Sequence, residues 1–126
     1  MIKVIDYGIG NLLAFKNIYK SLNIPFGFVK ANNDFEDATH LILPGVGSFD
    51  YSMNLLSRSG LLENLNFYVK EKKIPILGVC VGMQMMGDMS EEGKIPGLSW
   101  IKGKTKSFKN IDHFNLPLPH MGWNTI

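Results

Sequence analysis

The only cysteine of the chain lies in the pattern that most clearly indicates chemistry. The segment Gly78–Gly82 reads Gly-Val-Cys-Val-Gly, and the apolar run Ile74–Val79 leads directly into its cysteine. A nucleophile on a sharp turn between a buried strand and a helix needs small residues on both sides, because strand and helix approach closely there. Such a turn projects the side chain at the carboxyl end of a sheet, where α/β folds bind ligands. The pattern predicts a nucleophilic Cys80, although an inert cysteine at a tight turn would need the same glycines.

A helix beginning near Val81 would assist this cysteine. The unpaired N–H groups at a helix N-terminus favour the thiolate over the thiol. Such activation matters because an unperturbed cysteine is only a few per cent thiolate at about pH 7.

A second glycine-containing loop, Pro44–Gly47, follows the apolar run Leu41–Leu43. If the two apolar runs form neighbouring strands, this loop lies beside Cys80. Its backbone N–H groups, together with that of Val81, would then form an oxyanion hole for a tetrahedral intermediate. Taken alone, the loop is more typical of a tight turn between a strand and a helix, and only the two loops together favour the oxyanion hole.

A thiol nucleophile of this kind needs a histidine base, and none of the three histidines is well placed. His40 precedes a strand, which puts it at the amino edge of the sheet. His113 lies in a polar stretch, and His120 follows the rigid segment Leu116–Pro119. The residues therefore predict a nucleophile and an oxyanion hole without a base.

The elements that must position these residues alternate between strand and helix along the chain. Apolar runs predict strands at Ile2–Ile5, Phe26–Val29, Leu41–Leu43 and Ile74–Val79. Helical spacing predicts a helix over Leu12–Leu22, between the first two strands, and two helical segments, Tyr51–Leu56 and Leu61–Lys70, before the last strand. Runs that are apolar on both faces indicate a parallel sheet covered on both sides, so we expect a doubly wound α/β fold. Trp100–Phe108 reads instead as strands with one wet, lysine-rich face, and Gly122–Ile126 resembles the start of a strand.

Composition limits the remaining possibilities. The chain has 126 residues, 45% of them hydrophobic, with a net charge of +2, which fits one globular domain and gives no reason to expect a nucleic-acid or membrane partner. A single cysteine excludes an internal disulfide, and no apolar run approaches the ~20 residues needed to cross a bilayer. Neither metal-ligand spacing nor a phosphate-binding glycine motif is present. We expect a cytoplasmic protein without metal or cofactor.

Four motifs in order resemble one family, and the resemblance runs from Met1 to Ile126. The family is the class I, triad-type glutamine amidotransferases, specifically the glutaminase subunits of imidazole glycerol phosphate synthase in histidine biosynthesis. The motifs are Asp6–Asn11, Leu43–Gly47, Gly78–Gln84 and Pro119–Asn124. The resemblance implies a flavodoxin-like, mostly parallel sheet with helices on both faces.

The resemblance also implies roles for particular residues. Cys80 would attack the side-chain amide of glutamine, and the backbone of Val46 or Gly47 and of Val81 would hold the oxyanion. Gly45 and Gln84 match positions that contact the bound glutamine. Ammonia would pass to a partner (β/α)8-barrel cyclase, and the positions matching that heterodimer interface are Asn11, Met121, Trp123 and Asn124. The same residues around Trp123, taken alone, fit either a protein-interface anchor or a core tryptophan beside a turn.

One departure from the family is large. Family members are longer, and their catalytic His and Glu lie in a His-Pro-Glu motif near the C-terminus that this sequence does not reach. The resemblance therefore implies that residues 1–126 form a single amidotransferase domain that is truncated at its C-terminal end. We expect this chain alone to be inactive, and its open sheet edge to be prone to association.

Three rival functions share these residues. A paralogous subunit would supply ammonia for amidination of a surface sugar. An interaction module would keep the Trp123 surface without catalysis, and a generic cysteine hydrolase or thiol sensor would use Cys80 on the same fold. The identity of the partner, glutamine hydrolysis, and the reactivity of Cys80 towards peroxide or glutamine analogues separate these possibilities.

Overall fold

The central element is a four-stranded parallel sheet in the order β2-β1-β3-β4. The computed structural model describes residues 1–113, 115–119, 121–123 and 125. The strands are β1 (Ile2–Ile5), β2 (Phe26–Val29), β3 (His40–Gly45) and β4 (Ile76–Cys80). Each predicted strand of the first 80 residues is therefore present, and all run in the same direction, as expected.

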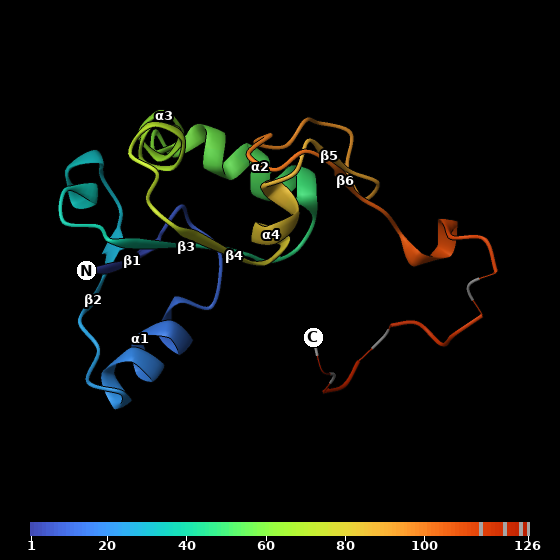
Figure 1. Ribbon diagram of the computed structural model, residues 1–126, viewed down its shortest axis with the longest axis horizontal. Coiled ribbons are helices and arrows are strands. Elements are labelled where there is room, and N and C mark those ends of the chain that lie inside the picture. The colour runs from blue at the N-terminus through green and yellow to red at the C-terminus, as the bar shows by residue number, and fades with distance from the viewer. Residues whose placement is uncertain (114, 120, 124, 126) are drawn as a thin grey trace.

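Helices cover both faces of the sheet (Figure 1). One face carries α1 (Leu12–Ser21), and the other carries α2 (Phe49–Arg58), α3 (Leu62–Asn66) and α4 (Val81–Met85). The shorter elements are 3₁₀ turns at Asn32–Phe35 and Phe108–Asn110, a π-helical turn at Phe67–Glu71, and a small parallel pair, β5 (Met89–Ser90) with β6 (Lys104–Thr105). This architecture confirms the doubly wound α/β fold.

Side-chain caps fix where the two longest helices begin. The Asn11 side chain accepts a hydrogen bond from the N–H of Ala14, which caps the first turn of α1. Ser48 does the same for α2 through the N–H of Tyr51. Because α2 starts at Phe49, only residues 46–48 connect it to β3, which keeps this loop short.

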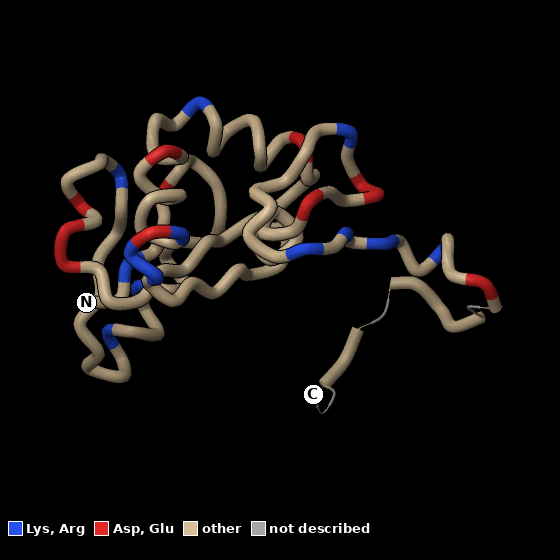
Figure 2. The backbone as a smooth tube through the Cα atoms, turned by 45° about the horizontal axis from the view of Figure 1, so that its top comes forward, with Lys and Arg blue, Asp and Glu red and all other residues tan. Residues whose placement is uncertain are grey.

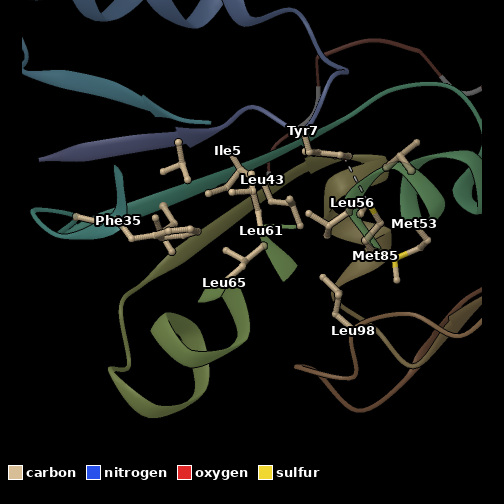
Figure 3. Packing of buried hydrophobic residues seen from close by; sticks show 14 of the residues in the cluster. Ile5, Tyr7, Phe35, Leu43, Met53, Leu56, Leu61, Leu65, Met85 and Leu98 are labelled. Atoms are coloured by element: carbon tan, nitrogen blue, oxygen red, sulfur yellow. Dashed lines mark hydrogen bonds between the residues drawn. The ribbon is translucent and has the colours of Figure 1, made fainter. Parts of the chain in front are cut away.

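The hydrophobic core lies between the sheet and the layer of α2, α3 and α4 (Figure 3). Phe35, Phe49, Leu56 and Leu65 are fully buried there. Each such side chain stabilises the fold by about 1.5–3 kcal/mol relative to exposure. The opposite layer is thin, because α1 has no buried residue and Leu77 on the edge strand β4 is 60% exposed. The packing that holds β3, β4 and α4 together therefore comes from the α2 side.

The region after residue 98 differs from its prediction. Within Trp100–Phe108 only Lys104 and Thr105 form a strand, because Ser99 (φ 52) and Gly103 (φ 141) interrupt the extended backbone. Trp100 is anchored instead by its indole N–H, which donates to the Asn66 side chain at 2.8 Å. At the end of the chain, the described residues 121–123 and 125 do not form the expected strand.

The lysines of this region extend along one stretch of chain near β6 (Figure 2). Lys102 pairs with Asp88 at 3.7 Å and Lys104 with Glu91 at 3.9 Å, and the lysine side chains are 90% and 48% exposed, respectively. Such pairs contribute little in water. The predicted wet, lysine-rich face is therefore present, although most of it is not strand.

Asp50 in the first turn of α2 holds the loop that leads to Trp100. Its carboxylate accepts hydrogen bonds from the backbone N–H groups of Lys94, at 2.9 and 3.0 Å, and of Ile95, at 3.2 Å. Replacement Asp50→Ala should lower the free energy of unfolding by about 1–3 kcal/mol, because charge-assisted bonds are lost. Urea unfolding measures this change.

The matched control is Glu63→Ala, which removes an exposed acidic residue from the first turn of α3. It tests the interaction of a carboxylate with the helix dipole, without the loop contacts. An equal loss of stability in both variants would contradict the role assigned to the Asp50 contacts.

Candidate functional site

Cys80 occupies a strained turn between β4 and α4. It is the last residue of the strand and the residue immediately before the helix, with φ 56 and ψ −121. Residues other than glycine rarely adopt this backbone conformation. It costs on the order of 1–3 kcal/mol and persists only where the surrounding structure enforces it. The thiol is exposed. The predicted sharp turn and the outward projection of the cysteine are therefore confirmed.

The glycines on either side of Cys80 are required by close packing. A Cβ atom on Gly78 would lie 2.5 Å from the Cα of Met83 in α4. A Cβ atom on Gly82 would overlap the carbonyl oxygen of Leu43 in β3. Neither site has room for even a methyl group, so the strand and the helix pack backbone against backbone, as the spacing predicted.

The loop after β3 lies directly beside this turn. Gly45 and Cys80 are register partners in the parallel ladder. A Cβ atom on Gly45 would overlap the backbone nitrogen of Gly82 and would come within 2.7 Å of the Val81 carbonyl carbon. An oxyanion hole beside Cys80 needs β3 and β4 to be neighbours, and this contact confirms that they are. Beyond it, Val46 is 46% exposed and Gly47 has φ 79, so this end of the loop is open to solvent.

Two buried hydroxyl groups that the sequence analysis did not single out hold this loop. The Tyr7 hydroxyl donates to the carbonyl oxygen of Pro44 at 2.5 Å. It also lies 3.6 Å from the Met85 sulfur (Figure 3). Burial raises the pKa of Tyr7, so the hydroxyl stays protonated at neutral pH. The Ser52 hydroxyl donates to the carbonyl oxygen of Val46 at 3.2 Å. Tyr7 belongs to the motif Asp6–Asn11, whereas no motif in the sequence contains Ser52.

Gln84 lies one turn into α4 and lines an open cavity of about 750 Å³. Its side-chain oxygen is 3.4 Å from the hydroxyl of the buried Ser90. The same cavity is lined by the carboxylate-bearing Glu92 and by two cationic residues, Lys106 and Lys109. Charges of both signs around an amide are suited to a zwitterionic amino acid. Gln84 was predicted from the sequence, whereas Glu92, Lys106 and Lys109 come beside it only in the folded chain.

Glu91 anchors the segment that forms one wall of this cavity. Its carboxylate accepts hydrogen bonds from the Asn110 side chain and the Ser107 N–H, both at 2.9 Å. These bonds, the one from Asn110 first, lower the pKa of Glu91. The anchoring is therefore fully present above the ordinary pKa of a glutamate and is lost as the pH falls through the lowered value.

The described residues do not place a histidine base beside Cys80. His40 begins β3 while its far end, Gly45, pairs with Cys80, so at about 3.3 Å per residue they are separated by roughly 17 Å. His113 is exposed on the segment beyond β6, and His120 lies outside the described residues. Within the described part of the chain, no group of three His, Cys, Asp or Glu residues has the geometry of a metal site.

The four residues expected at a partner interface lie at the surface where they are described. Asn11 is exposed and caps α1. Met121 is 83% exposed and Trp123 is fully exposed, so neither side chain packs in the core of this structure. Asn124 lies outside the described residues. A role in partner binding remains a prediction for all four.

The strained turn at Cys80 lies beside a glycine loop on a parallel sheet, and this arrangement is typical of one class of protein. Comparison with known families identifies that class. Residues 3–125 match the family model described as glutamine amidotransferase class-I, and the chain belongs to this family. It is 47% identical to the imidazole glycerol phosphate synthase subunit HisH of Bdellovibrio bacteriovorus and 50% identical to the protein of that name from Leptospira interrogans. Each alignment covers 100% of this chain and 62% of the relative.

A solved structure gives the same result for the fold. A protein described as a glutamine amidotransferase superposes with a TM-score of 0.69 at 20% sequence identity, covering 89% of this chain and 59% of the other. At this identity the likeness establishes the fold only. Among the described residues, no helix is long and apolar enough to cross a membrane.

The close packing at Gly82 generates a stability prediction. Replacement Gly82→Ala should lower the free energy of unfolding by about 3 kcal/mol, because the new methyl group meets the rigid carbonyl of Leu43. The control is Gly27→Ala, where a Cβ atom would meet only the flexible Lys3 side chain at 3.3 Å and the Met1 sulfur at 3.5 Å. Chemical denaturation of both variants compares them. A Gly82→Ala protein as stable as the control would show that the strand and helix do not pack this closely.

Proposed function

We propose that this chain is the nucleophile-bearing part of a glutaminase that supplies ammonia to a synthase in histidine biosynthesis. The observation that supports this most strongly is the backbone contact that puts the strained Cys80 turn beside the Gly45 loop. Membership of the class I glutamine amidotransferases and the similarity to synthase subunits give the substrate class. The chain spans 62% of the length of those relatives, so the activity belongs to the complete protein.

In the proposed reaction the Cys80 sulfur attacks the side-chain amide carbon of glutamine. A carbon–sulfur bond forms and the carbonyl oxygen becomes an oxyanion, which backbone N–H groups of Val46 or Gly47 and of Val81 stabilise. Collapse of the intermediate breaks the carbon–nitrogen bond and releases ammonia once the nitrogen is protonated. Water then hydrolyses the thioester to glutamate and restores the thiol. The histidine and glutamate that move these protons lie, in this proposal, in the remainder of the complete protein.

Substrate recognition is assigned to the cavity beside α4. Gln84 and the backbone of Gly45 would contact the glutamine side chain, in line with the family resemblance. Glu92 would pair with the α-ammonium group and Lys106 or Lys109 with the α-carboxylate, because these side chains line the same cavity with opposite charges. This arrangement favours an amino acid over a simple amide.

The partner in this proposal is a (β/α)8-barrel cyclase that accepts the ammonia in a cytoplasmic heterodimer. The relatives are named as one subunit of a synthase, which implies a second subunit for those proteins. Met121 and Trp123 expose large apolar side chains that a protein interface would bury. Asn11 and Asn124 complete the predicted interface.

Replacement of the nucleophile tests the proposed function. In the complete protein with its synthase partner, Cys80→Ala should reduce glutamate production from glutamine by about 10³-fold or more. Synthesis of the cyclase product from added ammonia should remain, because the barrel subunit would then receive its substrate directly. Glutamate production that survives in Cys80→Ala would overturn the assignment.

The 126-residue chain alone is predicted to lack glutaminase turnover, because no described histidine lies beside Cys80. A coupled glutamate assay on the isolated chain and on the complete protein measures this difference. Glutamate production by the isolated chain that Cys80→Ala abolishes would show that another group supplies the base.

A further inference from the structure

We propose that Ser52 and Tyr7 are positioning residues that fix the orientation of the loop beside Cys80. This inference rests on the proposed function, because it assigns to that loop the donors of the oxyanion hole. Neither hydroxyl is expected to touch glutamine. Each acts through one backbone carbonyl of the loop, that of Val46 or that of Pro44.

Ser52 sets the peptide group between Val46 and Gly47. Its side chain is fully buried in α2, and its hydroxyl donates to the Val46 carbonyl oxygen at 3.2 Å. In a trans peptide the carbonyl and the following N–H point in opposite directions. Holding the carbonyl towards α2 therefore turns the N–H of Gly47 away from that helix. Gly47 has φ 79 and no side chain to resist rotation, so the hydroxyl selects one orientation of this peptide.

Tyr7 acts in the same way two residues earlier. It reaches from the turn after β1 and donates to the Pro44 carbonyl oxygen at 2.5 Å, which fixes the direction of the Gly45 N–H. Its hydroxyl also lies 3.6 Å from the sulfur of Met85 in α4, the helix that begins after Cys80. One side chain thus links the end of β1, the end of β3 and the nucleophile's helix.

The two hydroxyls hold alternate carbonyls of one short loop from two different elements. Between them, Gly45 abuts the backbone of Val81 and Gly82. The peptide between Gly45 and Val46 is therefore held on both sides, by the bond to Pro44 before it and by the bond to Val46 after it. Hydrogen-bond donors aligned in advance are what an oxyanion hole requires, and losing one such donor entirely lowers kcat by about 10²–10³-fold.

The test uses Ser52→Ala and Tyr7→Phe in the complete protein with its partner, with matched controls that remove exposed hydroxyls. The controls are Ser57→Ala for the serine and Tyr51→Phe for the tyrosine, both on α2. Each test variant should lower kcat for glutamine hydrolysis by about 10-fold with KM unchanged, because the donors are still present but less often aligned. The controls should match the unmodified protein.

Alkylation of Cys80 by iodoacetamide separates alignment from general damage. In this reaction a carbon–sulfur bond forms and iodide leaves, so no oxyanion develops. The alkylation rate should therefore stay within about twofold in both variants. Ser52→Thr, which keeps a hydroxyl, should restore most of kcat if the variant is folded by circular dichroism.

Several results would overturn the proposal. Folded Ser52→Ala and Tyr7→Phe proteins with unchanged kcat would do so, as would a fall in alkylation that parallels the fall in kcat. An equal loss in Ser52→Ala and Ser52→Thr would show that side-chain volume matters and the hydroxyl does not. Failure of the proposed function itself would be recognised separately, because the unmodified protein would then show no glutamine hydrolysis, or the hydrolysis would survive in Cys80→Ala.

Discussion

The structure depends on the contact between two backbones, where the end of β3 meets the start of α4. Gly45 lies against Val81 and Gly82, and Gly82 lies against Leu43, with no space for a side chain. This contact forces Cys80 into its rare conformation and brings the glycine loop beside it. The buried core of α2, α3 and α4 supplies the stability that such a strained turn costs.

Much of the fold and part of the site could be predicted from the sequence, because they rest on local rules. Apolar runs such as Ile2–Ile5 gave the strands, and the glycines around Cys80 gave the turn. Trp100–Phe108 could not be predicted, because there a tertiary contact to Asn66 and positive φ angles override a strand-like pattern. The contact made by Ser52 could not be predicted either, because its hydrogen bond to the Val46 carbonyl forms only in the folded chain.

The comparisons and the geometry support one another at different levels. The family model places this chain among the class I glutamine amidotransferases, and the structure shows how the chain builds the strained turn at Cys80. The relatives extend beyond the matched region, since the chain spans 62% of their length. The described residues place the strained Cys80 turn beside the Gly45 loop, whereas the charged cavity is lined by Gln84 and its neighbours and not by Cys80.

The most direct test of the central claim, that Cys80 is the nucleophile of a glutamine site, is covalent labelling of the complete protein with a chloroketone analogue of glutamine. The sulfur displaces chloride and forms a carbon–sulfur bond, and mass spectrometry of the intact protein and its peptides locates the adduct. We predict a single adduct on Cys80 whose formation is slowed by glutamine. Labelling at another residue, or labelling of Cys80 at a rate that glutamine does not change, would contradict the account.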